Sequence, residues 1–263
     1  MQPNTLYIYL TTSALFLAKE EQGDEPRFYL SRCDISPYTP FATALDNVLA
    51  EKKAMHADTE KVRIFVEGPV SIIPMVDFSE EIFRTYHEYC IPSSFEHRTF
   101  CDPLPAANAM LIFSVADNIY KTLEERFDDI YFSSCMTYAA SYFIKKNTYK
   151  DTPKRLLVSL REGAVDLIAV ESGRLLAVNT FETGADSDII YYTMGIASKL
   201  GVSAETDTFY VSGNAKSVAS VVAELEKFAR NINVLNLTED FGKYIMPNEG
   251  DLPLNLLTAL AET

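Results

Sequence analysis

Short apolar runs separated by polar stretches open the chain. The runs cover residues 6–10, 14–19 and 28–33, and their close spacing predicts an antiparallel meander of three strands. A helix is expected next, with Thr39 as its N-cap and Pro40 at its first position, because apolar residues then recur at helical spacing. This helix should cover one face of the meander.

The apolar pattern becomes irregular after a short buried strand at residues 62–66. Residues 67–107 are rich in proline and contain one expected helix, DFSEEIFRTYHEY, in which Asp77 and Glu80 have the spacing of a capping box. A strong strand follows at residues 109–115. Since a regular alternation of helices and strands resumes after that strand, we interpret residues 67–107 as an insertion.

The second half of the chain repeats the order of the first. Strands are predicted at residues 156–159, 165–170 and 175–180, followed by a helix that Gly201 closes. A strand, a long helix whose buried face runs to Phe228, another strand and a final helix complete the pattern. Both halves therefore follow a β-β-β-α-β-α order, which indicates an internal duplication.

The polar stretch DTPKR marks the boundary between the two halves. We therefore predict a first domain of residues 1–150 and a second domain of residues 151–263. The last helix, expected over residues 252–261, follows the completed second repeat. It is expected to pack back towards the first domain.

Composition and charge exclude several classes of function. The chain has 263 residues, enough for two domains, and its 23 Lys and Arg against 37 Asp and Glu give a net charge of -14. This charge repels the phosphates of nucleic acids and of anionic membranes. The amino-terminal stretch lacks the features of a signal peptide, and no window is apolar enough for a membrane helix. We expect a cytoplasmic protein that neither binds nucleic acid nor inserts into a membrane.

The four cysteines form no CxxC pair, which is typical of a reducing compartment. One arrangement has the ligand inventory of a zinc site, because His87, Cys90, His97 and Cys101 lie close together in the sequence. Zinc knuckles hold each pair on a tight turn, whereas His87 and Cys90 fall on an expected helix. We therefore predict no metal site.

Two β-β-β-α-β-α units facing one cleft are the plan of the actin-like ATPase superfamily, which the chain resembles over nearly its whole length. The implied class is an α/β protein with the actin-like ATPase fold, in which two ribonuclease H-like lobes surround an interdomain cleft. The resemblance assigns several stretches to the nucleotide cleft: YLTTSALFLA, VSLREGAVDLIAVESGRLLAVNTFETG and a loop in the place of the adenosine-contacting glycines. The implied cleft residues are Thr11, Thr12, Ser13, Ser159, Arg161, Glu162, Thr183, Gly184, Ser212, Gly213 and Asn214.

The insertion resembles the one carried by bacterial pilus-assembly and secretion scaffolds of this superfamily. The chain is also similar to a Bacteroidetes family of actin-like fold with no assigned activity. Either resemblance implies a fold and leaves the function open.

The chain departs from the superfamily where carboxylates should hold magnesium. Leu10 and Ser159 stand where two strand-terminal aspartates are expected, and the linker IYFSSCMTYAA contains no acid. Arg161 and Glu162 occupy positions where small residues would admit a phosphate. We therefore assign no catalytic residue, no cofactor and no metal, although weak binding of ATP or ADP through Arg161 stays compatible with the sequence.

Two details, one in each domain, allow both a functional and a structural interpretation. Thr183 and Gly184 precede a helix and could bind an anion there, or Gly184 could supply a turn and Asp186 or Ser187 the N-cap. Polar residues 11–13 could contact a phosphate, or could simply form a hairpin turn. We favour the structural interpretation for both.

Three hypotheses about function follow from these observations. The first is a non-hydrolysing scaffold, a pseudo-ATPase, that binds another protein through the insertion or the cleft. Two observations support it: the nucleotide site lacks its expected carboxylates, and the chain has 15 Tyr and 16 Phe, several of them in the insertion, which are residue types that favour protein interfaces. The second is a nucleotide-dependent ATPase, kinase or switch that uses substitute acids. The candidate substitute acids are Glu162, Asp166 and Asp186, although strand alternation argues against Asp166. The third hypothesis is a nuclease.

Overall fold

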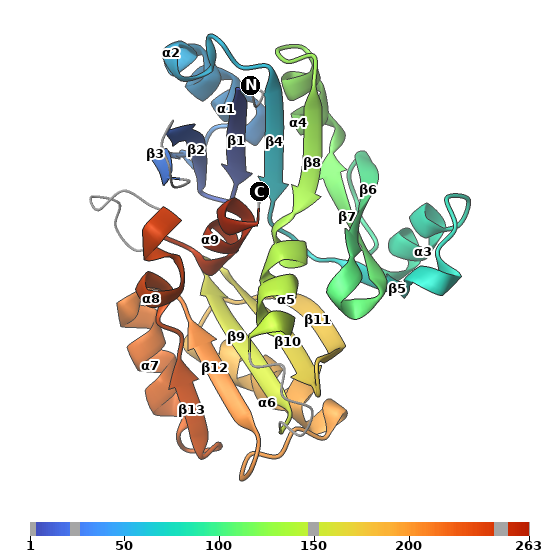
Figure 1. Cartoon of the computed structure of the whole chain (residues 1–263), viewed down its shortest axis with the longest axis vertical. Helices are drawn as coiled ribbons and strands as arrows, with labels where there is room; N and C mark the ends of the chain where they lie inside the picture. The colour runs from blue at the N-terminus through green and yellow to red at the C-terminus, as the bar shows by residue number, and fades with distance from the viewer. Residues whose placement is uncertain (1–3, 22–26, 147–152, 245–251, 263) are drawn as a thin grey trace.

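A three-stranded antiparallel meander forms the first part of lobe I, the upper half of the molecule in Figure 1. The computed structural model describes residues 4–21, 27–146, 153–244 and 252–262. The first strand also pairs in parallel with a fourth, and the fourth with a fifth, in the order β3-β2-β1-β4-β8. The strands are β1 (Thr5–Leu10), β2 (Ala14–Glu21), β3 (Arg27–Asp34), β4 (Lys61–Val66) and β8 (Ile130–Ser134).

Lobe II, the lower half in Figure 1, has a sheet of the same topology. Its order is β11-β10-β9-β12-β13, again with three antiparallel strands followed by two parallel ones. The duplication that the apolar pattern predicts is therefore confirmed. The strands are β9 (Arg155–Arg161), β10 (Ala164–Glu171), β11 (Arg174–Glu182), β12 (Thr208–Ser212) and β13 (Asn231–Val234).

Helices cover both faces of each sheet.

The first helix begins at Phe41, with Pro40 rather than Thr39 at the N-cap. The expectation for Thr39 is wrong because the first hydrogen bond of the helix runs from the Ala44 amide to the Pro40 carbonyl oxygen, which makes Pro40 the N-cap residue. The helices of lobe I are α1 (Phe41–Glu51), α2 (Lys53–His56), α4 (Asp117–Glu124) and α5 (Cys135–Lys145).

The second lobe contains one helix that is shorter than its apolar stripe suggests. It ends at Leu225, so Phe228 lies beyond it with 53% of its surface exposed, although the stripe places it on the buried face. Gly201 closes the preceding helix in a left-handed conformation, as expected. The helices that follow lobe II strands are α6 (Asp186–Leu200), α7 (Ala215–Leu225), α8 (Leu237–Phe241), the 3-10 turn η3 (Gly242–Tyr244) and α9 (Leu254–Ala261).

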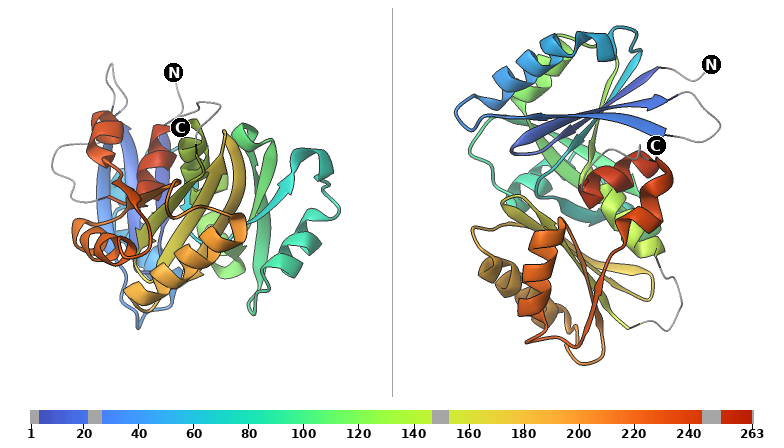
Figure 2. Two further views of the ribbon diagram at one scale, coloured as in Figure 1. Left: turned by 90° about the horizontal axis from the view of Figure 1, so that it is seen from below. Right: turned by 90° about the vertical axis from the view of Figure 1, so that its left-hand side faces the viewer.

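The insertion is a small subdomain with its own sheet, which projects to one side of lobe I (Figure 2). Strand β7, which the sequence places after the insertion, pairs with β5 and β6 and so belongs to this sheet. We call residues 67–116 the insertion subdomain. Its elements are β5 (Ser71–Pro74), η1 (Met75–Asp77), α3 (Phe83–Cys90), β6 (His97–Leu104), η2 (Pro105–Ala107) and β7 (Ala109–Ala116).

The expected capping box in this subdomain does not form. Asp77 ends a 3-10 turn, Glu80 lies in the turns that follow, and α3 begins only at Phe83. Neither acid caps the helix, because Ile82 takes the N-cap position without a side-chain hydrogen bond. The helix is therefore shorter than the apolar pattern predicts.

Helices α5 and α9 lie side by side between the two sheets (Figure 1). Apolar residues of α5, α9 and both sheets belong to one continuous buried cluster. Its members include Ile8 from the sheet of lobe I and Ile168 from the sheet of lobe II. The two lobes therefore share a hydrophobic core. The predicted boundary at residue 151 lies outside the described residues, and among the described residues no helix is long and apolar enough to cross a membrane.

Candidate functional site

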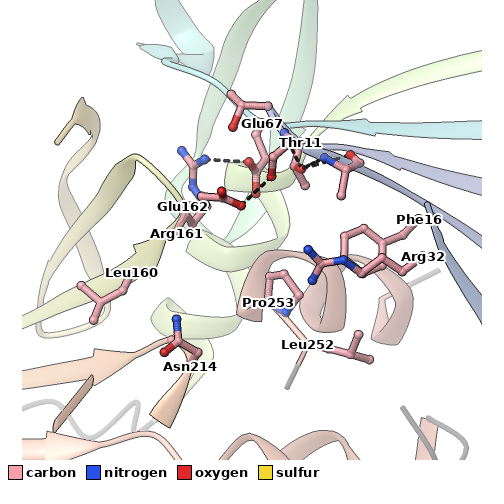
Figure 3. A pocket seen from close by; sticks show the side chains of 14 residues that line it. Thr11, Phe16, Arg32, Glu67, Leu160, Arg161, Glu162, Asn214, Leu252 and Pro253 are labelled. Atoms are coloured by element: carbon pink, nitrogen blue, oxygen red, sulfur yellow. Dashed lines mark hydrogen bonds and ion pairs between the residues drawn. The ribbon is translucent and has the colours of Figure 1, made fainter. Parts of the chain in front are cut away.

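Arg161, the last residue of β9, lies between the two lobes and lines a pocket there (Figure 3). Its Nη1 donates to Oε2 of Glu67, which follows β4 in lobe I, over 2.7 Å. Its Nε and Nη2 donate to the two carboxylate oxygens of Asp166 on β10, over 2.6 and 2.9 Å. The guanidinium therefore links a carboxylate of each lobe, and all three side chains are at least nine-tenths buried.

Three more side chains complete what we call the Arg161 network. Thr180 on β11 donates to Asp166 Oδ1 over 2.7 Å, and Asn255 Nδ2 on α9 donates to Asp166 Oδ2 over 2.9 Å. Tyr9 on β1 donates its hydroxyl proton to the second carboxylate oxygen of Glu67. Every oxygen of the two carboxylates has a donor, which is the condition for a buried charge to be tolerated.

Burial and charge act in opposite directions within this network. Burial raises the pKa of Glu67, while the Arg161 guanidinium and the Tyr9 hydroxyl oppose that rise. Burial lowers the pKa of Arg161, but attraction to Asp166 and Glu67 outweighs burial and raises it overall. Arg161 therefore remains a fixed cation between the lobes.

A hollow of about 170 Å³ opens beside the network (Figure 3). The Ser13 hydroxyl of lobe I donates to Oε2 of Glu162 in lobe II over 2.6 Å at its edge. Several residues predicted for the nucleotide cleft do come together here, and residues of β3 and of the segment before α9 join them. The lining includes Thr11, Thr12, Ser13, Phe16, Arg32, Glu67, Arg161, Glu162, Gly213, Asn214 and Pro253.

The polar residues 11–13 form the hairpin between β1 and β2. Thr11 accepts hydrogen bonds from the backbone N–H groups of Ser13 and Ala14 and donates to the carbonyl oxygen of Ala14. The Thr11 side chain therefore serves the turn. Of this trio only Ser13 reaches across the cleft.

Ser159 and Ser212 are not among the residues that line the hollow. Both are buried, and their hydroxyls are 3.2 Å apart in a hydrogen bond between β9 and β12. Gly213 allows the next loop to approach β9, because a Cβ built on it would lie 2.8 Å from Cβ of Leu160. Asn214 accepts a hydrogen bond from the Ser217 amide and so caps α7. The last two features have structural explanations.

Thr183 and Gly184 lie away from the hollow. The carboxylate of Asp188 accepts hydrogen bonds from the backbone N–H groups of Gly184 and Ala185, over 2.8 and 3.1 Å. The start of α6 therefore carries its own anion. The expectation that Asp186 or Ser187 caps this helix is wrong: Ala185 is the N-cap residue, and the Asp186 carboxylate accepts the Ser220 hydroxyl of α7.

Asp166 faces lobe I, against the expectation from strand alternation. Gly163, with φ of +70°, makes a two-residue turn with Glu162 that sets Ala164 opposite Arg161 and Asp166 opposite Ser159. Directly opposed residues of antiparallel strands share a face. Asp166 therefore shares the face of Ser159 and Arg161, a relationship that the turn sequence Glu162-Gly163 could have indicated.

Asp102 on β6 supplies a carboxylate at the start of α5, where the linker sequence contains none. Its Oδ2 accepts hydrogen bonds from Ser133 Oγ, the Ser134 amide and Thr137 Oγ1, over 2.7, 2.7 and 2.8 Å. Its Oδ1 is buried without a partner among the described residues. Burial raises the pKa of Asp102, and the three hydrogen bonds oppose this. Sequence reasoning missed this residue because it lies in the insertion.

The four zinc-compatible residues do not converge on one site. His87 is buried in α3, where its Nδ1 lies 2.8 Å from Ser71 Oγ, and Cys90 is exposed. Within the described part of the chain, no group of three or more His, Cys, Asp or Glu side chains is arranged to hold a metal ion.

A family of proteins matches residues 3–232 of the chain, and its description is "Protein of unknown function (DUF3822)". The chain belongs to the DUF3822 family. No curated protein matches it. The family covers both lobes and the whole Arg161 network except Asn255, which follows the matched residues.

Two solved structures show that this member of the DUF3822 family has the actin-like ATPase fold. A Bacteroides thetaiotaomicron protein of actin-like ATPase fold and unknown function has a TM-score of 0.86 and 21% identity, covering 99% of this chain and 96% of that one. The PilM-PilN type IV pilus biogenesis complex has a TM-score of 0.60 and 14% identity, covering 99% and 95%. The fold class is confirmed, and so is the likeness in fold to a protein of unknown function and to a pilus-assembly protein.

Proposed function

We propose that this DUF3822 protein is a non-hydrolysing actin-like scaffold that binds another protein. The observation that carries the proposal is the position of Arg161 between Glu67 and Asp166. In this arrangement a side chain of the protein supplies the positive charge that a metal ion would otherwise supply between two carboxylates.

Magnesium in nucleotide sites is held by one or two carboxylates, waters and phosphate oxygens. Here each oxygen of Glu67 and Asp166 already accepts a hydrogen bond from within the protein. A metal ion would have to displace Arg161 and leave its guanidinium without a carboxylate. Removing one partner of a buried ion pair costs about 3–5 kcal/mol, which opposes metal binding.

The hollow is also small for a nucleotide. Its volume of about 170 Å³ is below the roughly 300–1,000 Å³ of typical small-molecule sites. The Ser13–Glu162 hydrogen bond joins the two lobes at its edge and would have to break if the lobes moved apart to admit a triphosphate. The size of the hollow and the charges beside it therefore both disfavour binding of a nucleotide with magnesium.

Opening the lobes would disrupt a shared core. Helices α5 and α9 bring residues of both sheets into one buried apolar cluster, and Asn255 of α9 is tied to Asp166 of lobe II. Hinged switches rely on a few residues that absorb the motion between domains. A shared core instead suits a rigid scaffold.

A structure of similar fold is a complex of two proteins, PilM and PilN. That likeness supports a protein partner for this chain as well. The cytoplasmic location expected from the sequence stays a prediction.

The alternative is a nucleotide-dependent enzyme or switch that uses substitute acids. The observation in its favour is that Glu67 and Asp166 are buried carboxylates beside the hollow, which would become free if Arg161 swung onto a phosphate. Asp186 no longer fits this role, because its carboxylate is engaged by Ser220 of α7.

Calorimetry with ATP and ADP, with and without magnesium, tests the proposal. We expect affinities weaker than about 1 mM, no effect of magnesium, and no phosphate release. Magnesium-dependent hydrolysis that disappears in Glu67→Gln or Asp166→Asn, and persists in the matched control Asp186→Asn, would overturn the scaffold in favour of the enzyme.

A further inference from the structure

Exposed apolar side chains concentrate on one segment of the insertion subdomain. Among the described residues, twelve large apolar side chains are exposed, and six of them fall within residues 75–95. Such a concentration is typical of an interaction surface, since single exposed apolar residues are normally scattered. The six are Met75, Val76, Ile82, Tyr86, Tyr89 and Phe95.

Helix α3 has two apolar faces with different roles. Phe83 and His87 point inward, and Phe83 packs in the small core of the subdomain with Ile73. Ile82, Tyr86 and Tyr89 recur at i, i+4 and i+7, so they form a second stripe along the helix, with 51%, 37% and 87% of their surfaces exposed. Tyr86 also donates its hydroxyl proton to the carbonyl oxygen of Ile72 over 2.9 Å, whereas Ile82 and Tyr89 are not part of the small core.

Acidic side chains are frequent in the segment that carries the outer stripe. Five carboxylates between residues 77 and 96 are exposed, and none forms an ion pair or a side-chain hydrogen bond within the described part of the chain. The only lysine or arginine in the same segment is Arg84, which lies over the Phe83 ring. The segment therefore has a strong negative charge, with one arginine against five carboxylates. The five are Asp77, Glu80, Glu81, Glu88 and Glu96.

The subdomain holds this surface on a rigid base. Phe100 of β6 stacks on Phe113 of β7 and on Phe132 of β8, with ring centroids 5.8 and 5.1 Å apart. Tyr120 of α4 stacks on Phe132 in turn, and the Arg98 guanidinium lies 3.6 Å above the Tyr120 ring. This column joins the insertion sheet to lobe I. A partner bound to α3 would therefore be fixed relative to the lobes.

We propose that the outer face of α3 is a docking surface for a basic, apolar segment of a partner protein. Apolar anchors of that segment would cover Ile82 and Tyr89, and its Lys or Arg side chains would pair with the exposed carboxylates of the same segment. A second copy of this chain is disfavoured, since two such faces would repel each other, and an anionic membrane is disfavoured for the same reason. This inference rests on the proposed scaffold function and names the chemistry of its partner.

Selection from a display library of random 16-residue peptides tests the inference with the full chain. The expected enriched peptides carry a net positive charge and two or more large apolar residues. Ile82→Ser combined with Tyr89→Ser should weaken their binding at least about tenfold, which corresponds to 1.4 kcal/mol. Glu80→Gln with Glu81→Gln and Glu88→Gln should also weaken it and reduce its dependence on salt.

The matched control is Tyr38→Ser, which removes an aromatic side chain that is 95% exposed outside the insertion subdomain. It should leave peptide affinity unchanged. Enriched peptides without net positive charge, equal affinity in the Ile82→Ser/Tyr89→Ser variant, or self-association abolished by that variant would overturn the inference. If the docking surface failed in this way while the protein still did not hydrolyse ATP, the pseudo-ATPase part of the proposed function would stand. Failure of the docking surface can therefore be told apart from failure of the proposed function.

Discussion

Glu67 of lobe I and Arg161 of lobe II form an ion pair across the interdomain space, with 2.7 Å between Oε2 and Nη1. Both side chains are 93% buried, since 7% of each is exposed. An ion pair at this depth is maintained by its hydrogen bonds, because each partner without the other would be a desolvated charge. Admitting a ligand between the lobes would therefore require breaking this ion pair.

Replacing Arg161 should destabilise the protein strongly. Arg161→Ala leaves Glu67 and Asp166 buried without a cation, which should lower the free energy of unfolding by about 3–5 kcal/mol. Urea unfolding measures this. The matched control is Arg32→Ala, which removes an arginine from the same hollow whose pair with Asp34 is solvent-exposed, and it should cost less than about 1 kcal/mol. A similar small cost for both variants would contradict the structural role of Arg161.

Gly213 should tolerate no side chain. Gly213→Ala places a methyl group 2.8 Å from Cβ of Leu160, at a residue whose φ is +149°, and this should lower the free energy of unfolding by about 1–3 kcal/mol. The matched control is Gly195→Ala in α6, where nothing lies within 4 Å. That variant should raise stability by up to about 1 kcal/mol, because alanine favours a helix interior. Equal stability of the two variants would argue against the close packing of the loop after β12.

Asp102 should tolerate asparagine better than alanine. Asp102→Ala removes the acceptor of three buried hydrogen bonds at the start of α5, and we expect a loss of about 2–4 kcal/mol. Asp102→Asn keeps one acceptor oxygen and should cost about 1 kcal/mol. Thermal or urea unfolding of both variants checks this order. If the two variants lost the same free energy, the acceptor oxygen would not be the group that stabilises the helix start.

The raised pKa of Asp102 predicts how stability depends on pH. A carboxyl group with a higher pKa in the folded than in the unfolded protein binds protons more tightly when folded. Stability is therefore lost as pH rises from the ordinary value of 3.8 through the raised folded value. Asp102→Asn cannot titrate, so the stability of the wild type minus that of the variant should fall across this window and then level off. A difference that grows with pH would mean that hydrogen bonding outweighs burial and lowers the pKa.

Local patterns along the chain predict the two lobes well. The short apolar runs of the strands and the glycine after α6 involve residues close in sequence, so their physical causes can be recognised one segment at a time. The same patterns failed where a buried face was assumed from periodicity alone. Phe228 has the spacing of a core stripe, yet it is exposed because α7 already ends at Leu225.

The candidate site could be predicted only in part, because its partners come from distant segments. Arg161 was expected in the cleft, but Glu67 is 94 positions away and Asn255 lies 89 positions from Asp166. Nothing in either local sequence indicates that these groups meet. Composition and periodicity can be read from the sequence itself. The partner of a buried charge depends instead on how the two sheets and α9 pack together, because only the folded arrangement removes water from all of these charged side chains at once.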